Sequence, residues 1–134
     1  MAKFSYIALP GADGKAVYKP LIKARLIYRK THKLTNPIYA LIDSGADVSF
    51  CEKNIGIWLG INFSKLKKER FRAANNKYFI SLKEILSLNT ANKSYTCPFY
   101  FADTLAYPII LGQKGFFDHF KIIFDLKNKE IEVT

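Results

Sequence analysis

The sequence predicts an all-β domain with one or two short helices. Two uncharged runs rich in branched and aromatic residues, 38–42 and 107–112, each lead into a turn that contains glycine. Such runs are typical of buried β-strands. The length of 134 residues, with 49% hydrophobic and 24% charged residues, fits a single globular domain over residues 1–134.

Nine stretches fit strands, because apolar and β-branched residues dominate them and turn-forming residues separate them. The expected strands lie at residues 4–9, 21–28, 38–42, 63–73, 78–88, 94–102, 107–112, 121–125 and 130–133. A turn at 10–14, which contains an Asp-Gly pair, completes an N-terminal strand and turn over residues 1–20. In the strand at 21–28, Lys23 and Arg25 are expected to face solvent, and Ala24, Leu26 and Tyr28 are expected to face the other side.

Short helices are expected at two places. Ser49 and Glu52 have the spacing of a capping box, which predicts a helix that begins there and runs to about Leu59. Gly60 then ends it. A second short helix is expected within residues 112–120.

A hairpin is expected over residues 63–88, because its two strands flank consecutive asparagines that tolerate a tight turn. Residues 81–86 also fit a helical turn, so this part of the hairpin has two interpretations. Pro98 cannot donate a backbone hydrogen bond, and it therefore places the strand at 94–102 on an edge or beside a bulge.

The strand at 38–42 delivers a carboxylate, Asp43, onto the turn Ser44-Gly45. A carboxylate at the end of a buried strand is costly unless solvent or other groups compensate it. Gly45 gives the turn backbone freedom, and Ser44 places a small hydroxyl beside the acid. The plain alternative is an ordinary Asx turn between two strands.

Two motifs together resemble the retropepsin-like aspartic proteases, in particular their small single-domain bacterial members. The first is Asp43-Ser44-Gly45-Ala46-Asp47, and the second is Ile110-Leu111-Gly112. The resemblance covers roughly residues 21–134. It implies a closed single-domain acid-protease barrel and an aspartic endopeptidase, a hydrolase that uses neither cofactor nor metal.

The resemblance also implies roles for individual residues. Asp43 would be catalytic, and Ser44, Gly45, Ala46 and Asp47 would support the dyad and bind substrate. The hairpin at 63–88 would be the flap that closes over a peptide or protein substrate, with its tip at Ala73, Ala74, Asn75 and Asn76. Because the chain contains a single Asp-Ser-Gly, the pair of carboxylates requires a homodimer.

Two departures from the family pattern leave a second function open. The flap tip contains no glycine, and Gln113 stands where the family has an arginine that pairs with the acid at Asp47. Lys114 or Arg25 is a candidate replacement for that arginine. The alternative is a catalytically weak or inert module of this fold that binds peptides or partner proteins.

Charge, cysteine content and the length of the apolar runs indicate which partners, metal sites and cellular locations to expect. The net charge of +10 is compatible with nucleic acid, but the basic residues are scattered and lack interleaved aromatics, so a nucleic-acid partner is not expected. Cys51 and Cys97 show no metal-ligand spacing and are expected to be reduced thiols. No apolar run is long enough for a signal peptide or a membrane span, so a cytoplasmic protein is expected.

Overall fold

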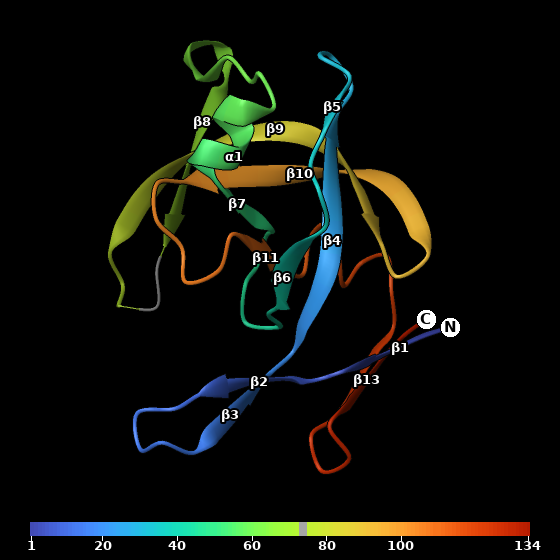
Figure 1. Ribbon diagram of the computed structural model, residues 1–134. Helices are drawn as coiled ribbons and strands as arrows, with labels where there is room; N and C mark the ends of the chain where they lie inside the picture. Colours follow the sequence, from blue (N-terminus) through green and yellow to red (C-terminus); the bar gives the residue numbers. More distant parts are fainter. Residues whose placement is uncertain (73–74) are drawn as a thin grey trace.

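The computed structural model describes residues 1–72 and 75–134, and strands dominate it (Figure 1). In chain order its elements are β1 (Ala2–Ser5), β2 (Ile7–Pro10), β3 (Ala16–Lys19), β4 (Leu21–Tyr28), β5 (Lys33–Leu34), β6 (Ile38–Ile42), β7 (Phe50–Glu52), α1 (Lys53–Trp58), the 3-10 helix η1 (Phe63–Lys65), β8 (Lys67–Arg72), β9 (Tyr78–Thr90), β10 (Lys93–Ala102), β11 (Ile109–Leu111), β12 (Ile122–Asp125) and β13 (Glu130–Val133). The predicted all-β class is confirmed.

Six strands close into a barrel. Their order is β4, β6, β11, β7, β10 and β9, and β9 pairs back onto β4. The short β5 continues the sheet beyond β4, and β8 continues it beyond β9. Closure gives every strand of the ring two neighbours, and so the ring itself leaves no open edge.

Buried and more exposed side chains alternate along the middle of β4, and the buried ones belong to the core. Ile22, Ala24 and Leu26 are buried, whereas Lys23 is exposed and Arg25 is partly exposed, as predicted. Other strands of the ring add fully buried large side chains from the opposite walls. These include Leu86, Leu88, Phe99, Ile109 and Leu111. Burying one such side chain contributes roughly 1.5–3 kcal/mol, so the barrel interior is the main source of stability.

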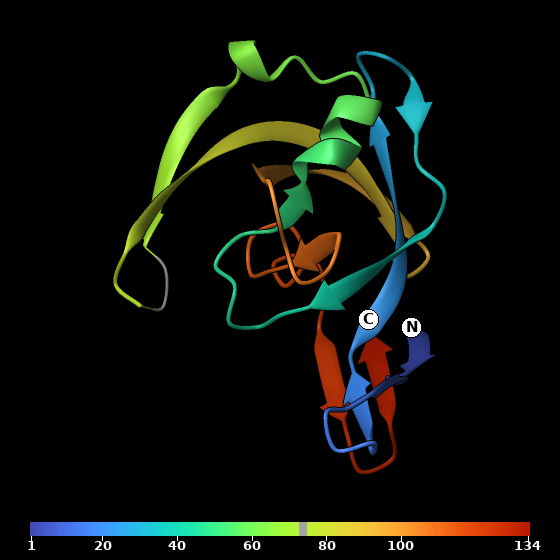
Figure 2. The same cartoon turned by 60° about the vertical axis from the view of Figure 1, so that its left-hand side comes forward.

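Two small sheets lie below the barrel (Figures 1 and 2). One consists of β1, β13 and β12, so the two ends of the chain lie side by side. The other is the β2–β3 hairpin. The expected single strand at 4–9 is therefore wrong, because the chain leaves the terminal sheet after Ser5 and pairs next with β3.

The first expected helix begins later than predicted. Residues 50–52 form β7, which pairs with β10 and β11, and α1 starts only at Lys53. The capping box is absent because the Ser49 hydroxyl is buried and bonded elsewhere, accepting from the Gly112 amide at 3.0 Å. Tertiary hydrogen bonds here override the local capping signal.

The second expected helix, within residues 112–120, is not formed. Residues 113–119 make successive turns, in which the Phe117 amide donates to the Gly112 carbonyl and the Asp118 amide to the Gln113 carbonyl. Gly115 has a φ of 104°, which an α-helix does not accommodate. The other helical segment is η1, at the start of the stretch expected to be a strand from 63 to 73.

Strands β8 and β9 form an antiparallel hairpin with Arg72 opposite Tyr78. We call residues 67–83 the flap hairpin. The helical interpretation of 81–86 is wrong, because these residues belong to β9. Of the expected tip, Ala73 and Ala74 lie outside the described residues. Asn76 has a positive φ of 67°, and the Asn75 side chain accepts from the Lys77 amide at 3.1 Å.

Candidate active site

Asp43 lies on a tight turn directly after β6. Its amide donates to the Leu111 carbonyl at 2.9 Å, which ties the start of the turn to β11. Its carboxylate oxygen Oδ1 accepts from the Gly45 amide at 3.0 Å, and its carbonyl accepts from the Ala46 amide at 3.2 Å. The hydrogen bond of an ordinary Asx turn, which is the alternative interpretation of this segment, is therefore present. It also fixes the direction in which the carboxylate points.

The carboxylate borders an open hollow of about 310 Å³ with mainly apolar walls. The residues lining it are Asp43, Ala46, Phe50, Ala102, Thr104, Leu105 and Ile110. Within the described part of the chain, no cationic side chain lies within 4 Å of this carboxylate. An acid of this kind is free to act on a bound molecule, because no salt bridge holds it.

The segment after β11 braces the turn from behind. The Gln113 amide donates to the Ala46 carbonyl at 2.8 Å, and the Lys114 amide donates to the Asp47 carbonyl at 3.1 Å. A Cβ atom on Gly112 would lie 2.2 Å from the Val48 carbonyl oxygen, so only glycine fits there. The second motif of the sequence thus meets the first in space.

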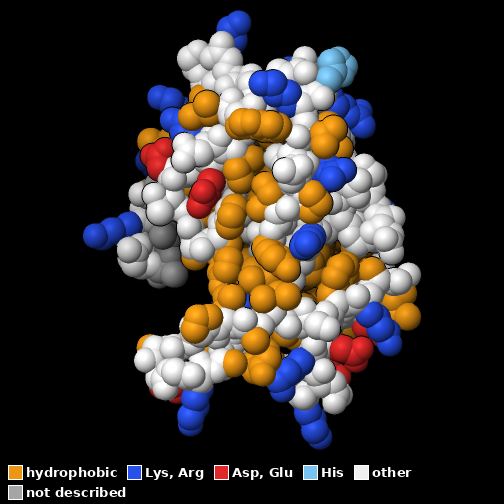
Figure 3. Space-filling view, in the orientation of Figure 1, with side chains coloured by type: hydrophobic (Ala, Val, Ile, Leu, Met, Phe, Trp, Pro, Cys, Tyr) orange, Lys and Arg blue, Asp and Glu red, His pale blue; other side chains and the backbone are white. Residues whose placement is uncertain are grey.

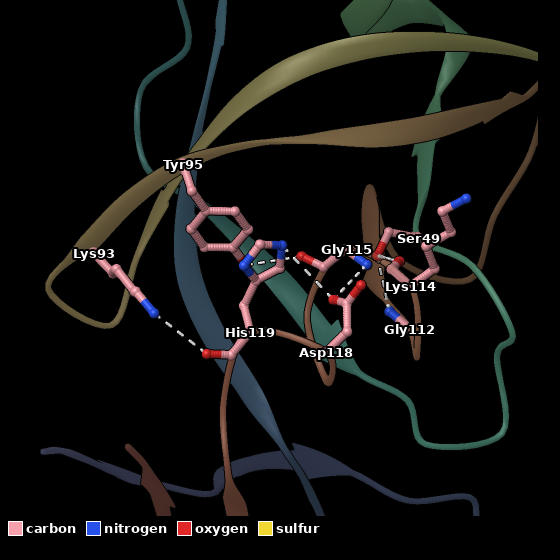
Figure 4. Close-up of polar contacts among 8 residues, drawn as sticks. All are labelled: Ser49, Lys93, Tyr95, Gly112, Lys114, Gly115, Asp118 and His119. Carbon is pink, nitrogen blue, oxygen red and sulfur yellow. Dashed lines mark hydrogen bonds and ion pairs between the residues drawn. The ribbon is translucent and has the colours of Figure 1, made fainter.

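Ser49 and Gly115 extend this brace into the barrel (Figure 4). The Ser49 hydroxyl donates to the Lys114 carbonyl at 3.0 Å, in addition to accepting from Gly112. The Gly115 amide donates to Asp118, and its carbonyl accepts from the Tyr95 hydroxyl at 2.8 Å. His119 stacks on Tyr95 with ring centroids 3.9 Å apart, which gives it a packing role.

Gln113 makes a contact that the sequence did not predict. Its side-chain Nε2 donates to the Ser44 carbonyl at 2.8 Å, inside the turn that follows Asp43. The glutamine that stands where the sequence resemblance led us to expect an arginine is therefore bonded to the turn itself. The side chain of Asp47 has no ion pair with any described residue, so neither Lys114 nor Arg25 serves as its cation.

An aromatic cluster joins the hollow to the flap hairpin. The rings of Phe50 and Phe71 lie 6.0 Å apart, and the Phe71 and Tyr100 rings 4.7 Å apart. Phe50 also lines the hollow beside Asp43. These aromatic residues come from three different strands, β7, β8 and β10. The residue pattern within any one strand therefore could not predict that they lie together.

Neither thiol is placed to act as a nucleophile. Cys51 and Cys97 are free and buried, and burial raises the pKa of Cys97 to about 12. Among the described residues, no cluster of three or more His, Cys, Asp or Glu side chains could hold a metal ion. No helix in the described ranges has the length and apolar character needed to cross a bilayer.

A larger groove of about 460 Å³ lies elsewhere, between α1 and the β5–β6 connection. Leu34, Ile38, Ile55 and Trp58 supply its apolar walls. It belongs to the face on which Figure 3 shows hydrophobic side chains gathered in a band. It shares no lining residue with the hollow at Asp43 and contains no acid, so it is not the candidate catalytic site.

Comparison with known proteins gives a structural match. No family model matches the sequence, and no curated protein matches it. A crystal structure of a retropepsin-like aspartic protease from Rickettsia conorii superposes with a TM-score of 0.59 and 19% sequence identity. The match covers 98% of this chain and 91% of the other. The chain therefore has the retropepsin-like all-β fold that its two motifs predicted.

Proposed function

We propose that this protein is an aspartic endopeptidase that works as a homodimer, with Asp43 as its catalytic residue. The observation that carries the proposal is the placing of Asp43. One carboxylate without a cationic partner among the described residues borders an open apolar hollow, on a turn braced by Gly112 and Gln113. The fold shared with an aspartic protease supports the same function.

The chemistry needs a second carboxylate, which the two-fold related subunit would supply. Two carboxylates a few ångströms apart cannot both ionise, so the pair holds one proton. The ionised Asp43 of one subunit takes a proton from a water molecule, and the oxygen of that water attacks the carbonyl carbon of the scissile bond. The protonated Asp43 of the other subunit donates its proton to the carbonyl oxygen. Collapse of the tetrahedral diol then breaks the C–N bond, and the leaving nitrogen gains a proton from the dyad.

Residues around Asp43 take supporting roles in this proposal. Ser44 and Asp47 are exposed, in positions open to a partner subunit and a peptide. Ser44 would bind the partner's turn, the Gly45 carbonyl would accept from the substrate backbone, and Asp47 would bind the peptide further along. Ala46 lines the hollow. The terminal sheet of β1, β13 and β12 is our candidate for the subunit interface.

The second candidate is an inert or weakly active module of the same fold that binds peptides or partner proteins. The observation that favours it is Asp47, whose side chain has no ion pair with a described residue. A module of this kind would bind peptides at the hollow without cutting them.

A cleavage assay with a matched variant distinguishes the two. Wild-type protein and Asp43→Asn are incubated with a diverse peptide mixture between pH 4 and 7, with and without an inhibitor of aspartic proteases. We expect the wild type to cleave and the inhibitor to stop it. Asp43→Asn should fold normally, because the amide matches the carboxyl in shape, yet it should not cleave, because it cannot act as a base.

A chelator should leave this activity unchanged. Cleavage by Asp43→Asn at the wild-type rate, or activity lost in EDTA and restored by zinc, would contradict the mechanism. Peptide binding by a wild-type protein that cleaves nothing would favour the second candidate.

A further inference from the structure

The positive charge of the chain is concentrated in the flap hairpin. Residues 67–83 contain six cationic side chains and one acidic side chain, so this short segment carries half of the net charge of +10. The cations are Lys67, Lys68, Arg70, Arg72, Lys77 and Lys83. A predominantly positive cluster of this size produces a positive local potential.

The one acid of the hairpin does not cancel this charge. Glu69 accepts from the Tyr100 hydroxyl at 2.9 Å and lies 3.5 Å from the Lys83 ammonium. The hydrogen bond from Tyr100 lowers the pKa of Glu69, and the charges of Lys83 and Lys67 lower it further. The other five cations are exposed, and none has an acidic partner within 4 Å among the described residues.

Two of these cations are held in place. The guanidinium groups of Arg70 and Arg72 lie 4.4 Å and 5.2 Å from the centre of the Tyr78 ring. Arg72 also donates to the Tyr78 hydroxyl at 2.5 Å. An arginine oriented in this way loses less freedom when it binds a carboxylate than a free lysine does. The hairpin thus presents a partly ordered cationic surface.

This surface adjoins the candidate active site. Phe71 on β8 packs against Phe50 and Tyr100, and Phe50 lines the hollow at Asp43. Arg70 and Arg72 alternate with Phe71 along the strand, so they lie on the outer face of the same hairpin. Figures 1 and 2 both show the hairpin reaching toward the end of the barrel that carries the turn between β6 and β7. A peptide in the hollow would lie beneath the aromatic rings, and the chain that flanks it would lie within the electrostatic field of the cations on the outer face of the hairpin.

We propose that the substrates are acidic peptides, in which an apolar or aromatic residue at the hollow is flanked by Asp or Glu. The inference rests on the proposed function and adds a substrate class to it. Cations around a cleft attract acidic segments, speed their encounter and disfavour basic ones. The apolar walls and the aromatic cluster take the central side chain.

The test uses two fluorogenic peptides with the same apolar centre, one flanked by glutamates and the other by lysines. We expect kcat/KM for the glutamate peptide to exceed that for the lysine peptide at least about tenfold in 50 mM salt. The ratio should shrink severalfold in 500 mM salt, because exposed charges are then screened.

Two matched double variants test whether the charges of the flap hairpin cause the preference for the glutamate peptide. Lys68→Gln/Arg70→Gln removes two charges from the flap hairpin, whereas Lys15→Gln/Lys33→Gln removes two exposed charges from elsewhere on the chain. The first pair should lower kcat/KM for the glutamate peptide at least about threefold and leave a neutral-flanked peptide unchanged. The second pair should change neither.

Equal cleavage of both peptides by an active wild type, at either salt concentration, would overturn the substrate inference while leaving the proposed function intact. If the wild type cleaves nothing, fluorescence anisotropy with the same peptides still decides the inference. Tighter binding of the glutamate peptide, weakened by Lys68→Gln/Arg70→Gln, supports it, and equal binding overturns it. Single-stranded RNA that displaces the glutamate peptide at physiological salt with a steep salt dependence also overturns it.

Discussion

Gln113 links the two motifs at the scale of single residues. Its main-chain amide donates to the Ala46 carbonyl and its side-chain amide donates to the Ser44 carbonyl, so one residue holds the turn after Asp43 at two points. The side chain is the only part of this clamp that mutation can remove without disturbing the backbone. It contributes about 1 kcal/mol if it behaves as an ordinary hydrogen bond.

We predict that Gln113→Ala lowers kcat by about two- to tenfold with little change in KM, because a looser turn misplaces Asp43. Gln113→Glu should lose as much, since a carboxylate cannot donate to the Ser44 carbonyl. Gln113→Arg keeps a donor and should retain more activity than either. Steady-state kinetics measure these values, and faster hydrogen exchange at the Gly45 and Ala46 amides in Gln113→Ala tests the clamp independently of catalysis.

At the scale of elements, the outer part of the flap hairpin extends beyond the strand pairing of the barrel. β9 pairs with β10 only as far as Leu82, and beyond that point β8 and β9 form a two-stranded ribbon. Such a ribbon is marginal on its own. The Tyr100–Glu69 hydrogen bond and the packing of Phe71 on Tyr100 therefore hold it against the site.

We predict that Tyr100→Phe loosens the hairpin without unfolding the barrel. Hydrogen exchange at β8 amides should accelerate at pH 6–7, while exchange in β4 and β6 stays the same. Because the folded-state pKa of Glu69 lies below its usual 4.5, the stabilisation is complete above pH 4.5 and is lost as pH falls through the folded value. Wild-type β8 should lose protection in that acidic range, after correction for intrinsic exchange, and Tyr100→Phe should lose less.

Elements that depend on local patterns could be predicted from the sequence, and elements that depend on distant partners could not. The runs that became β6 and β11 are recognisable because they contain no charge and are rich in branched and aromatic residues. Ser49 looks like a helix cap, but Gly112 and Lys114 occupy its hydroxyl, and residues 50–52 become a strand between β10 and β11. Similarly, Asp43 could be named from its motif, whereas Gln113, Phe71 and Tyr100 gain their roles only when the barrel closes.

At the scale of the whole molecule, each chain presents one Asp43 and one hollow, so the proposed enzyme exists only as an assembled pair. Specific activity should fall on dilution below the dimer dissociation constant, in step with the loss of dimer. Sedimentation at the same concentrations gives the dimer fraction independently. A monomer with constant specific activity would contradict the shared dyad.

The most direct test of that dyad mixes wild-type chains with an equal amount of Asp43→Asn chains under conditions of subunit exchange. A mixed pair has one carboxylate and one amide, and it cannot share a proton between two acids. Random pairing leaves about a quarter of the dimers fully wild type, so total activity should fall to about half its value before mixing. Activity that stays constant after exchange has been demonstrated would show that one Asp43 is sufficient, and would contradict the account.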